Sequence, residues 1–96
     1  MNKAINIDKA FSHFSDHWSP KLAGLVNDTA IKLAKLSGEF IWHKHEMEVE
    51  LFLVHRGTLE MQFREHSVLV KAGEFILVPR NTEHRPVAIS EVCEVL

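Results

Sequence analysis

Cysteine is almost missing from this 96-residue chain, and neither sign of charge dominates. The single cysteine, Cys93, excludes an internal disulfide and fits a reducing compartment. Eleven Lys and Arg residues against thirteen Asp and Glu residues give a net charge of -2, and no basic stripe is present, so we expect no nucleic-acid partner. The N-terminus has no apolar segment of signal-peptide length, and no later run approaches the ~18 residues of a membrane span. These absences predict a cytoplasmic protein without a membrane partner.

Long helical patterns are also lacking. Residues 8–14 predict one short helical turn near the N-terminus, capped by Asp8 and carrying Phe11 and Phe14. From Lys21 onward, alternating apolar residues and turn residues predict strands instead. We expect strands at residues 21–26, 29–36, 39–45, 50–56, 58–65, 67–73, 74–79, 84–89 and 91–96. Their spacing predicts one all-β domain over residues 1–96, built as a sandwich or small barrel.

The last predicted strand, "EVCEVL", is an apolar run with no turn behind it. We therefore expect it to be an edge strand or an incomplete one.

Histidine is what the chain has in excess, with seven residues. His43 and His45 are two residues apart in a predicted strand, so both side chains should lie on one face of it. Glu50 has the opposite parity, and it can join the pair only if residues 46–49 turn or bulge. Two imidazoles on one face of a strand, together with a carboxylate close to them, would provide three ligands of a metal site.

A fourth candidate for this site is His84, much further along the chain. It follows a strand that Pro79 stops and a turn at residues 80–81, and a closed sheet could place it beside the first pair. The alternative is that the four residues are separate surface groups, or polar groups bonded to water, and hold no metal.

The sequence from Gly38 to Ala88 resembles the cupin family, which has two motifs. The first motif is a glycine, an H-x-H pair, a glutamate and a second glycine. It is matched here by Gly38, His43, His45, Glu50 and Gly57, with Gly38 one residue closer than usual.

The second cupin motif is matched at Gly73, Pro79 and His84. Asn81 replaces its second glycine, and Ala88 replaces its final asparagine. Asparagine is the ordinary residue that most readily adopts the left-handed conformation, so we expect Asn81 to preserve the turn.

The resemblance implies a single-domain cupin with the motifs in residues 38–88. Such a domain is a double-stranded β-helix, or jelly-roll, barrel, here with the short helical turn near its N-terminus. The resemblance also implies a metal held by His43, His45, Glu50 and His84. Three imidazoles and a carboxylate suit a divalent transition metal, namely Mn, Fe, Co, Ni, Cu or Zn.

Three functions are compatible with such a site. The first is a metal-dependent enzyme of isomerase or oxygenase type, acting on a small metabolite. The second is a non-catalytic module that binds a metal or a small molecule, and the third is a structural, self-associating domain. We expect a small-molecule ligand or substrate and a homodimer, because the run "ELFLV" and the N-terminal residues Phe11, Phe14 and Trp18 leave apolar surface to cover.

The remaining candidates have simpler interpretations. Large apolar residues are expected in the core, although some could line a pocket: Phe40, Trp42, Phe52, Met61, Phe63 and Phe75. Arginines are expected to be solvated rather than to clamp an anion: Arg56, Arg64, Arg80 and Arg85. Glu48 is either a general base near Glu50 or a solvated loop carboxylate. Cys93 is expected to be packed rather than reactive, and His13, His17, His55 and His66 are expected not to be ligands.

Overall fold

The computed structural model describes residues 3–96, without the side chains of Cys93 and Val95. The predicted packing of Cys93 therefore lies outside the described residues. Within that range the chain forms one short helix and seven strands: α1 (Ile7–Phe11), β1 (Lys21–Val26), β2 (Thr29–Glu39), β3 (Glu50–Arg56), β4 (Thr58–Phe63), β5 (Ser67–Lys71), β6 (Phe75–Val78) and β7 (His84–Val95). The predicted all-β class is confirmed.

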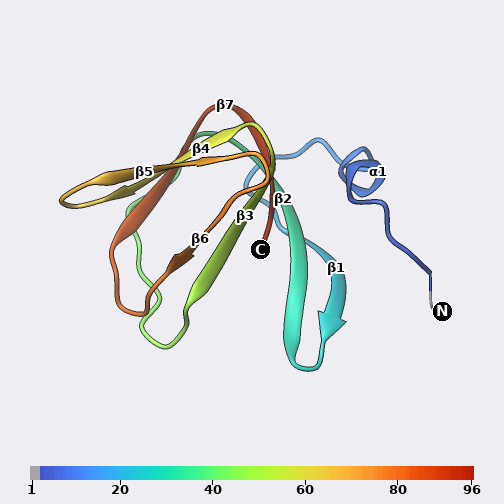
Figure 1. Ribbon diagram of the computed structural model, residues 1–96, viewed down its shortest axis with the longest axis horizontal. Helices are drawn as coiled ribbons and strands as arrows, with labels where there is room; N and C mark the ends of the chain where they lie inside the picture. The colour runs from blue at the N-terminus through green and yellow to red at the C-terminus, as the bar shows by residue number, and fades with distance from the viewer. Residues whose placement is uncertain (1–2) are drawn as a thin grey trace.

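The strands form one antiparallel sheet that folds over on itself (Figure 1). Its main path runs β1-β2-β7-β3-β6, while β4 pairs with β7 and carries β5. The long strand β7 connects these two parts of the sheet, because its start pairs with β4 and its end lies between β2 and β3. The jelly-roll architecture is confirmed, although β1, β5 and β6 remain edges and the sheet does not close into a full barrel.

The core lies between the facing halves of this sheet and follows the alternation of the strands. In β4, Leu59 and Met61 are fully buried while Glu60 and Gln62 are partly exposed. The main core consists of Ala34, Leu36, Phe52, Val54, Leu59, Met61, Val70, Val78, Ala88 and Val92. The predictions for Phe75 and Phe40 were wrong: Phe75 is 62% exposed on the outer face of the edge strand β6, and Phe40 is 37% exposed just after the end of β2.

Two strand predictions also need correction. Strand β2 continues through Gly38 to Glu39, with an irregularity in its pairing just before Gly38, and residues 40–49 form no regular strand. The two strands expected at 84–89 and 91–96 are one strand, β7, which lies inside the sheet instead of at its edge.

The N-terminal helical turn is present, with a different cap from the one expected. Asn6 caps α1, since its side-chain oxygen accepts a hydrogen bond of 2.9 Å from the Lys9 amide. Asp8 instead forms an ion pair with Arg56 and lies 3.2 Å from His55 Nε2. These contacts fasten the N-terminal segment to β3.

The structure explains why the first motif has a glycine at position 57. Gly57 turns the chain between β3 and β4 with a φ of 91°, a conformation that other residues rarely adopt. A Cβ atom at this position would lie 2.8 Å from the carbonyl oxygen of Glu91 in β7. A glycine is therefore needed both for the turn and for the close approach of β7.

None of the helices among residues 3–96 combines the length and the apolar character needed to cross a membrane. The cytoplasmic location and the single domain over residues 1–96 stay predictions.

Candidate metal centre

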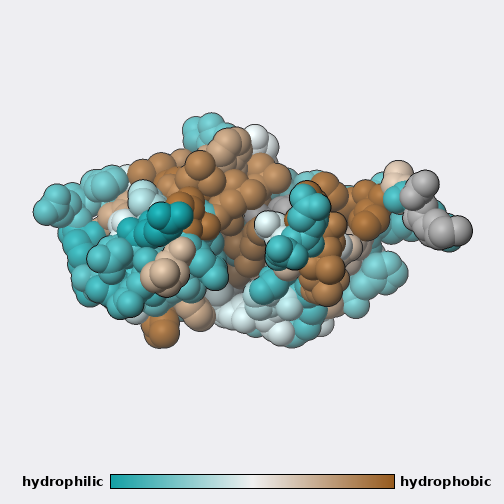
Figure 2. Space-filling view, turned by 90° about the horizontal axis from the view of Figure 1, so that it is seen from below, coloured by the Kyte–Doolittle hydropathy of each residue, from teal (hydrophilic) through white to brown (hydrophobic). Residues whose placement is uncertain are grey.

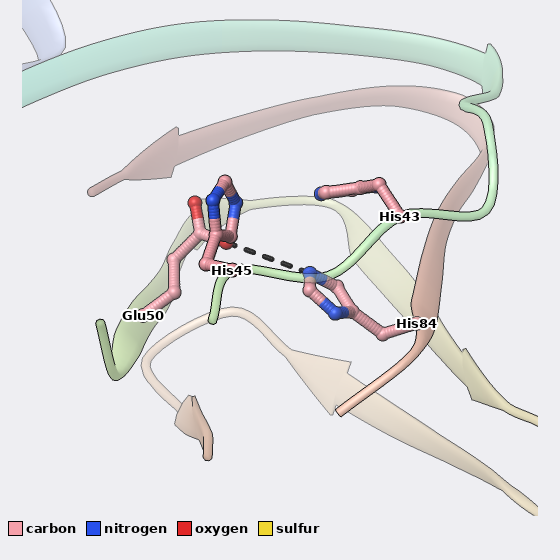
Figure 3. A group of neighbouring side chains, drawn as sticks. All are labelled: His43, His45, Glu50 and His84. Carbon is pink, nitrogen blue, oxygen red and sulfur yellow. Dashed lines mark ion pairs between the residues drawn. The ribbon is translucent and has the colours of Figure 1, made fainter. Parts of the chain in front are cut away.

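Four side chains from separate parts of the chain converge at one end of the folded sheet (Figure 3). They are His43, His45, Glu50 and His84, and one possible ligand atom from each lies within 4.8 Å of the others. The two histidines of the pair come from the segment between β2 and β3, Glu50 begins β3, and His84 begins β7. The structure thus brings together the four residues that the sequence singled out.

A pair of backbone hydrogen bonds sets His43 beside His84. The His43 amide donates to the His84 carbonyl at 3.0 Å, and the His84 amide donates to the His43 carbonyl at 2.9 Å. This isolated bridge is the only β-type pairing of residues 40–49 in the described structure. The centroids of the two imidazole rings lie 4.3 Å apart. A single bridge, not the regular strand that we expected, therefore positions the first histidine.

The turn before β7 positions His45. Asn81 has a φ of 56°, as we expected of the residue that replaces the motif glycine. In this left-handed conformation its amide donates a 2.7 Å hydrogen bond to the His45 carbonyl. The turn thus connects the two motifs directly through the backbone.

Backbone carbonyls fix the tautomers of two imidazoles. His43 Nδ1 lies 2.9 Å from the Ile41 carbonyl, and His84 Nδ1 lies 2.8 Å from the Thr82 carbonyl. A carbonyl oxygen only accepts, so each Nδ1 must carry the hydrogen and each neutral ring keeps its lone pair on Nε2. Ligand histidines are commonly oriented by this kind of outer hydrogen bond.

The electrostatics of the site centre on Glu50 and His84. Glu50 Oε1 lies 3.2 Å from His45 Nε2 and 3.5 Å from His84 Nε2. Within the described structure, Glu50 Oε1 and His84 Nε2 are buried and form no well-shaped hydrogen bond. Burial by itself lowers the pKa of His84, but the Glu50 carboxylate and the Thr82 carbonyl favour the imidazolium and together raise that pKa above its ordinary value of 6.5.

This donor set fits a metal ion. Buried polar atoms that lack partners are costly, and a cation placed among them would satisfy several at once. Donor atoms bound at about 2.1 Å to a six-coordinate ion lie roughly 3.0 Å apart when adjacent and 4.2 Å apart when opposite. The observed limit of 4.8 Å requires only a small inward movement.

A cavity of about 170 Å³ adjoins the cluster, and His43 and Glu50 belong to both. Its other lining residues are Trp18, Pro20, Ala34, Leu36, Phe40, Phe52, Pro86, Glu94 and Leu96. The walls are therefore almost entirely apolar, and among the residues that the structure describes the ionisable side chains at the cavity are those of His43, Glu50 and Glu94. Of the apolar residues expected in the core, Phe40 and Phe52 line this pocket.

The N-terminal segment closes one wall of the cavity, a role that the sequence did not suggest. The Trp18 amide donates to the Lys35 carbonyl and its indole Nε1 donates to the Ser37 carbonyl, both at 2.9 Å. The indole stacks on Phe40 with ring centroids 4.8 Å apart, and Phe40 in turn meets the His43 ring edge-on. Trp18 thus packs behind the site.

Glu94 is the site residue that the sequence analysis missed. It is only 2% exposed and faces inward from β7, and its Oε2 atom has no hydrogen-bond partner within the described structure. Burial, with a smaller contribution from the charge of Glu50, raises the pKa of Glu94 to about 8. A signal was available in "EVCEVL", because Glu94 shares its parity with the apolar residues Val92 and Leu96.

The other candidates lie away from the cluster. Glu48 is exposed and does not line the cavity. Three arginines form surface ion pairs, namely Arg56 with Asp8, Arg64 with Glu83, and Arg85 with Glu39. His66 stacks on Phe63 at the β4–β5 hairpin, and His17 pairs with Glu91 at 2.8 Å.

Comparison with known proteins decides the family. A model of the cupin domain matches residues 32–96. The chain is a cupin. The match covers all four residues of the cluster and begins within β2, so β1 and the segment that carries Trp18 precede it.

Two relatives resemble this cupin in sequence. A cupin-2 domain protein of Shewanella frigidimarina NCIMB 400 has 41% identity and a TM-score of 0.94, with 95% of this chain and 89% of that chain covered. The uncharacterized protein YdbB of Bacillus subtilis (strain 168) is 39% identical over 61 residues, which are 62% of this chain. The matched part spans only 54% of YdbB.

A more distant solved structure shares the fold. Hydroquinone 1,2-dioxygenase from Sphingomonas sp. TTNP3, solved with 4-hydroxybenzoate bound, has 17% identity and a TM-score of 0.83. The comparison covers 97% of this chain and 31% of that chain.

The raised pKa of Glu94 predicts a specific dependence of stability on pH. In EDTA-treated protein, folded Glu94 keeps its proton up to about pH 8, whereas the unfolded chain releases it near 4.5. Between these values the unfolded state binds fewer protons, so Glu94 makes the free energy of unfolding fall as the pH rises, by up to roughly 4 kcal/mol. Denaturant titrations at pH 5, 6.5 and 8 should show this fall to be smaller in Glu94→Gln. An equal fall in both proteins would contradict the burial of an ionisable Glu94.

Proposed function

We propose that this cupin is a metal-dependent enzyme of isomerase or oxygenase type, acting on a small molecule. His43, His45, Glu50 and His84 would hold a divalent transition metal. One observation carries the proposal: four possible ligand atoms lie within 4.8 Å of one another beside a cavity of small-molecule size, and two of them, His84 Nε2 and Glu50 Oε1, are buried without a hydrogen bond. A purely structural cluster would be expected to pair these atoms within the protein.

The cavity beside the proposed metal site could hold a substrate close to the metal. A first-row metal would act as a Lewis acid, with coordination positions left open by its four protein ligands. Since His43 and Glu50 also line the cavity, a molecule inside it would lie next to the ion site. Trp18 and Phe40 stack on each other in the wall of this cavity, and the Phe40 ring contacts His43. The oxygenase option is supported by the dioxygenase activity named for the Sphingomonas relative, which shares this fold.

Metal binding is the first prediction. Protein prepared without a histidine tag should contain about one transition-metal ion per chain, measured by elemental analysis. His45→Ala and His84→Ala should lose most of it, whereas His66→Ala, which removes a histidine at a hairpin tip, should keep it. Unchanged metal content in the first two variants would contradict the site.

The same measurement has an expected pH profile. Protons compete with the metal for imidazole nitrogens, so occupancy should fall on acidification. Because the pKa of His84 is raised above 6.5, the loss should begin at a higher pH than for an ordinary histidine.

Turnover is the second prediction. Protein loaded with Fe, Mn or Zn should be assayed for dioxygen uptake on phenolic substrates and for isomerisation of sugar phosphates. We expect one activity that Glu50→Gln lowers at least about tenfold and His66→Ala leaves unchanged, since Glu50 is a proposed ligand that lines the cavity and His66 is neither. Thermal shifts with these compounds, without any turnover, would favour the alternative of a non-catalytic binding module.

We also propose that the chain forms a homodimer through its β1 side. Large apolar residues are exposed there, namely Ile5, Leu22, Leu25 and Val26. Figure 2 shows apolar surface beside the tip of the β1–β2 hairpin and across the middle of the same face. Covering this surface with a second copy would remove it from water.

Light scattering at micromolar concentration should therefore give the mass of a dimer. Leu25→Glu should produce a monomer, because it places a charge in the proposed interface. Leu69→Glu, at an equally exposed leucine on β5, should remain dimeric. A monomeric wild-type protein would be evidence against the dimer.

A further inference from the structure

Glu94 is the one polar group of the cavity that the metal site does not use. The residue is 2% exposed and lines the same cavity as His43 and Glu50. Oε2 has no hydrogen-bond partner within the described structure, so the fold gains no contact from this atom while bearing the cost of burying it. At functional sites, replacing such a destabilising group often costs activity, which gives a reason to retain it.

The cavity itself restricts what can bind. A dry cavity of about 150 Å³ in another protein holds one benzene molecule, and this one has about 170 Å³. Aromatic and aliphatic side chains form nearly all of its wall, and no Lys or Arg is among the lining residues. Away from the metal site, a phosphate group would therefore have no positive side chain to balance it, whereas a single ring would match both the size and the walls.

We propose that Glu94 is a second polar anchor in this cavity, and that the ligand is a largely apolar, single-ring-sized molecule with two oxygen groups. One oxygen would bind at the metal, which rests on the proposed function, and the other would form a hydrogen bond with Glu94. The ligand class is thus a dihydroxy or keto-hydroxy ring compound without phosphate.

The state of the carboxyl supports this role. In the metal-free protein, burial and the charge of Glu50 raise the pKa of Glu94 to about 8, so its carboxyl is protonated at neutral pH. A protonated carboxyl both donates and accepts a hydrogen bond, as a hydroxyl group does, so the two are complementary. Glutamine also offers a donor and an acceptor at nearly the same length and is the conservative replacement.

A purely structural Glu94 predicts a different outcome for an apolar replacement. If the carboxyl stabilised the fold, Glu94→Leu would lower the unfolding temperature. Because Oε2 has no partner within the described structure, we expect Glu94→Leu at pH 8 to unfold at the same or a higher temperature than wild type. Glu94→Met serves as a second apolar variant should the leucine protein not fold.

Binding of simple phenols tests the anchor. The zinc-loaded protein is suitable because zinc undergoes no redox chemistry. Phenol, resorcinol and hydroquinone should be compared by calorimetry without oxygen, since the second hydroxyl of these two diols cannot reach the same ion as the first. We expect at least one diol to bind wild type about fivefold more tightly than phenol does, because one additional hydrogen bond contributes about that much to affinity. Glu94→Gln should keep this preference, and Glu94→Leu should bring the ratio of the two Kd values to about one.

The outcomes separate the two proposals. A diol preference that survives in Glu94→Leu, or that is missing from wild type, overturns the anchor. Failure of all three compounds to bind, or tighter binding of glucose 6-phosphate than of either diol, overturns the ligand class. Failure to take up zinc contradicts the proposed function instead. In that case the ratio of the Kd values for diol and phenol, measured in EDTA-treated protein, tests the role of Glu94 without the metal.

Discussion

The site depends on the backbone bridge between His43 and His84. Two reciprocal hydrogen bonds attach an otherwise irregular segment to the start of β7, and they set the two rings 4.3 Å apart. The short segment that follows His45 returns the chain to β3, whose first residue is Glu50. Without this bridge, residues 40–49 would have no β-type pairing in the described structure, and His43 would lose its fixed position beside His84.

The arrangement is costly for so small a protein. Three buried polar atoms have no hydrogen-bond partner within the described structure, namely Glu50 Oε1, His84 Nε2 and Glu94 Oε2, and all belong to residues of the metal cluster or the cavity. A domain of 96 residues has a narrow margin of stability, of about 5–15 kcal/mol, against which each such atom counts for about 1–3 kcal/mol. The concentration of these atoms in one place is best explained by groups that bind there.

The sequence predicted the regular parts of this protein because alternation is a local property. The alternation that includes Leu59 and Met61 is enough to predict strand β4. The residue type of Asn81 is enough to predict its left-handed conformation. The strand expected at 39–45 was wrong because one tertiary bridge, rather than a ladder, holds that segment. Phe75 and Glu94 were misjudged for a related reason: whether a strand lies at the edge or inside a sheet depends on its partners, which alternation does not reveal.

Strand β7 unites the metal cluster with the carboxyl of Glu94. His84, Pro86, Ala88, Val92 and Glu94 are all buried, and they share one parity along this single strand. Exposed residues 89–91 interrupt the pattern only where β7 changes partners from β4 to β3. One strand therefore provides a possible metal ligand at its start and an uncharged carboxyl near its end, both facing the same interior. Since β2, β3 and β4 all pair with β7, the positions of these two groups are fixed by the sheet itself and need no mobile loop.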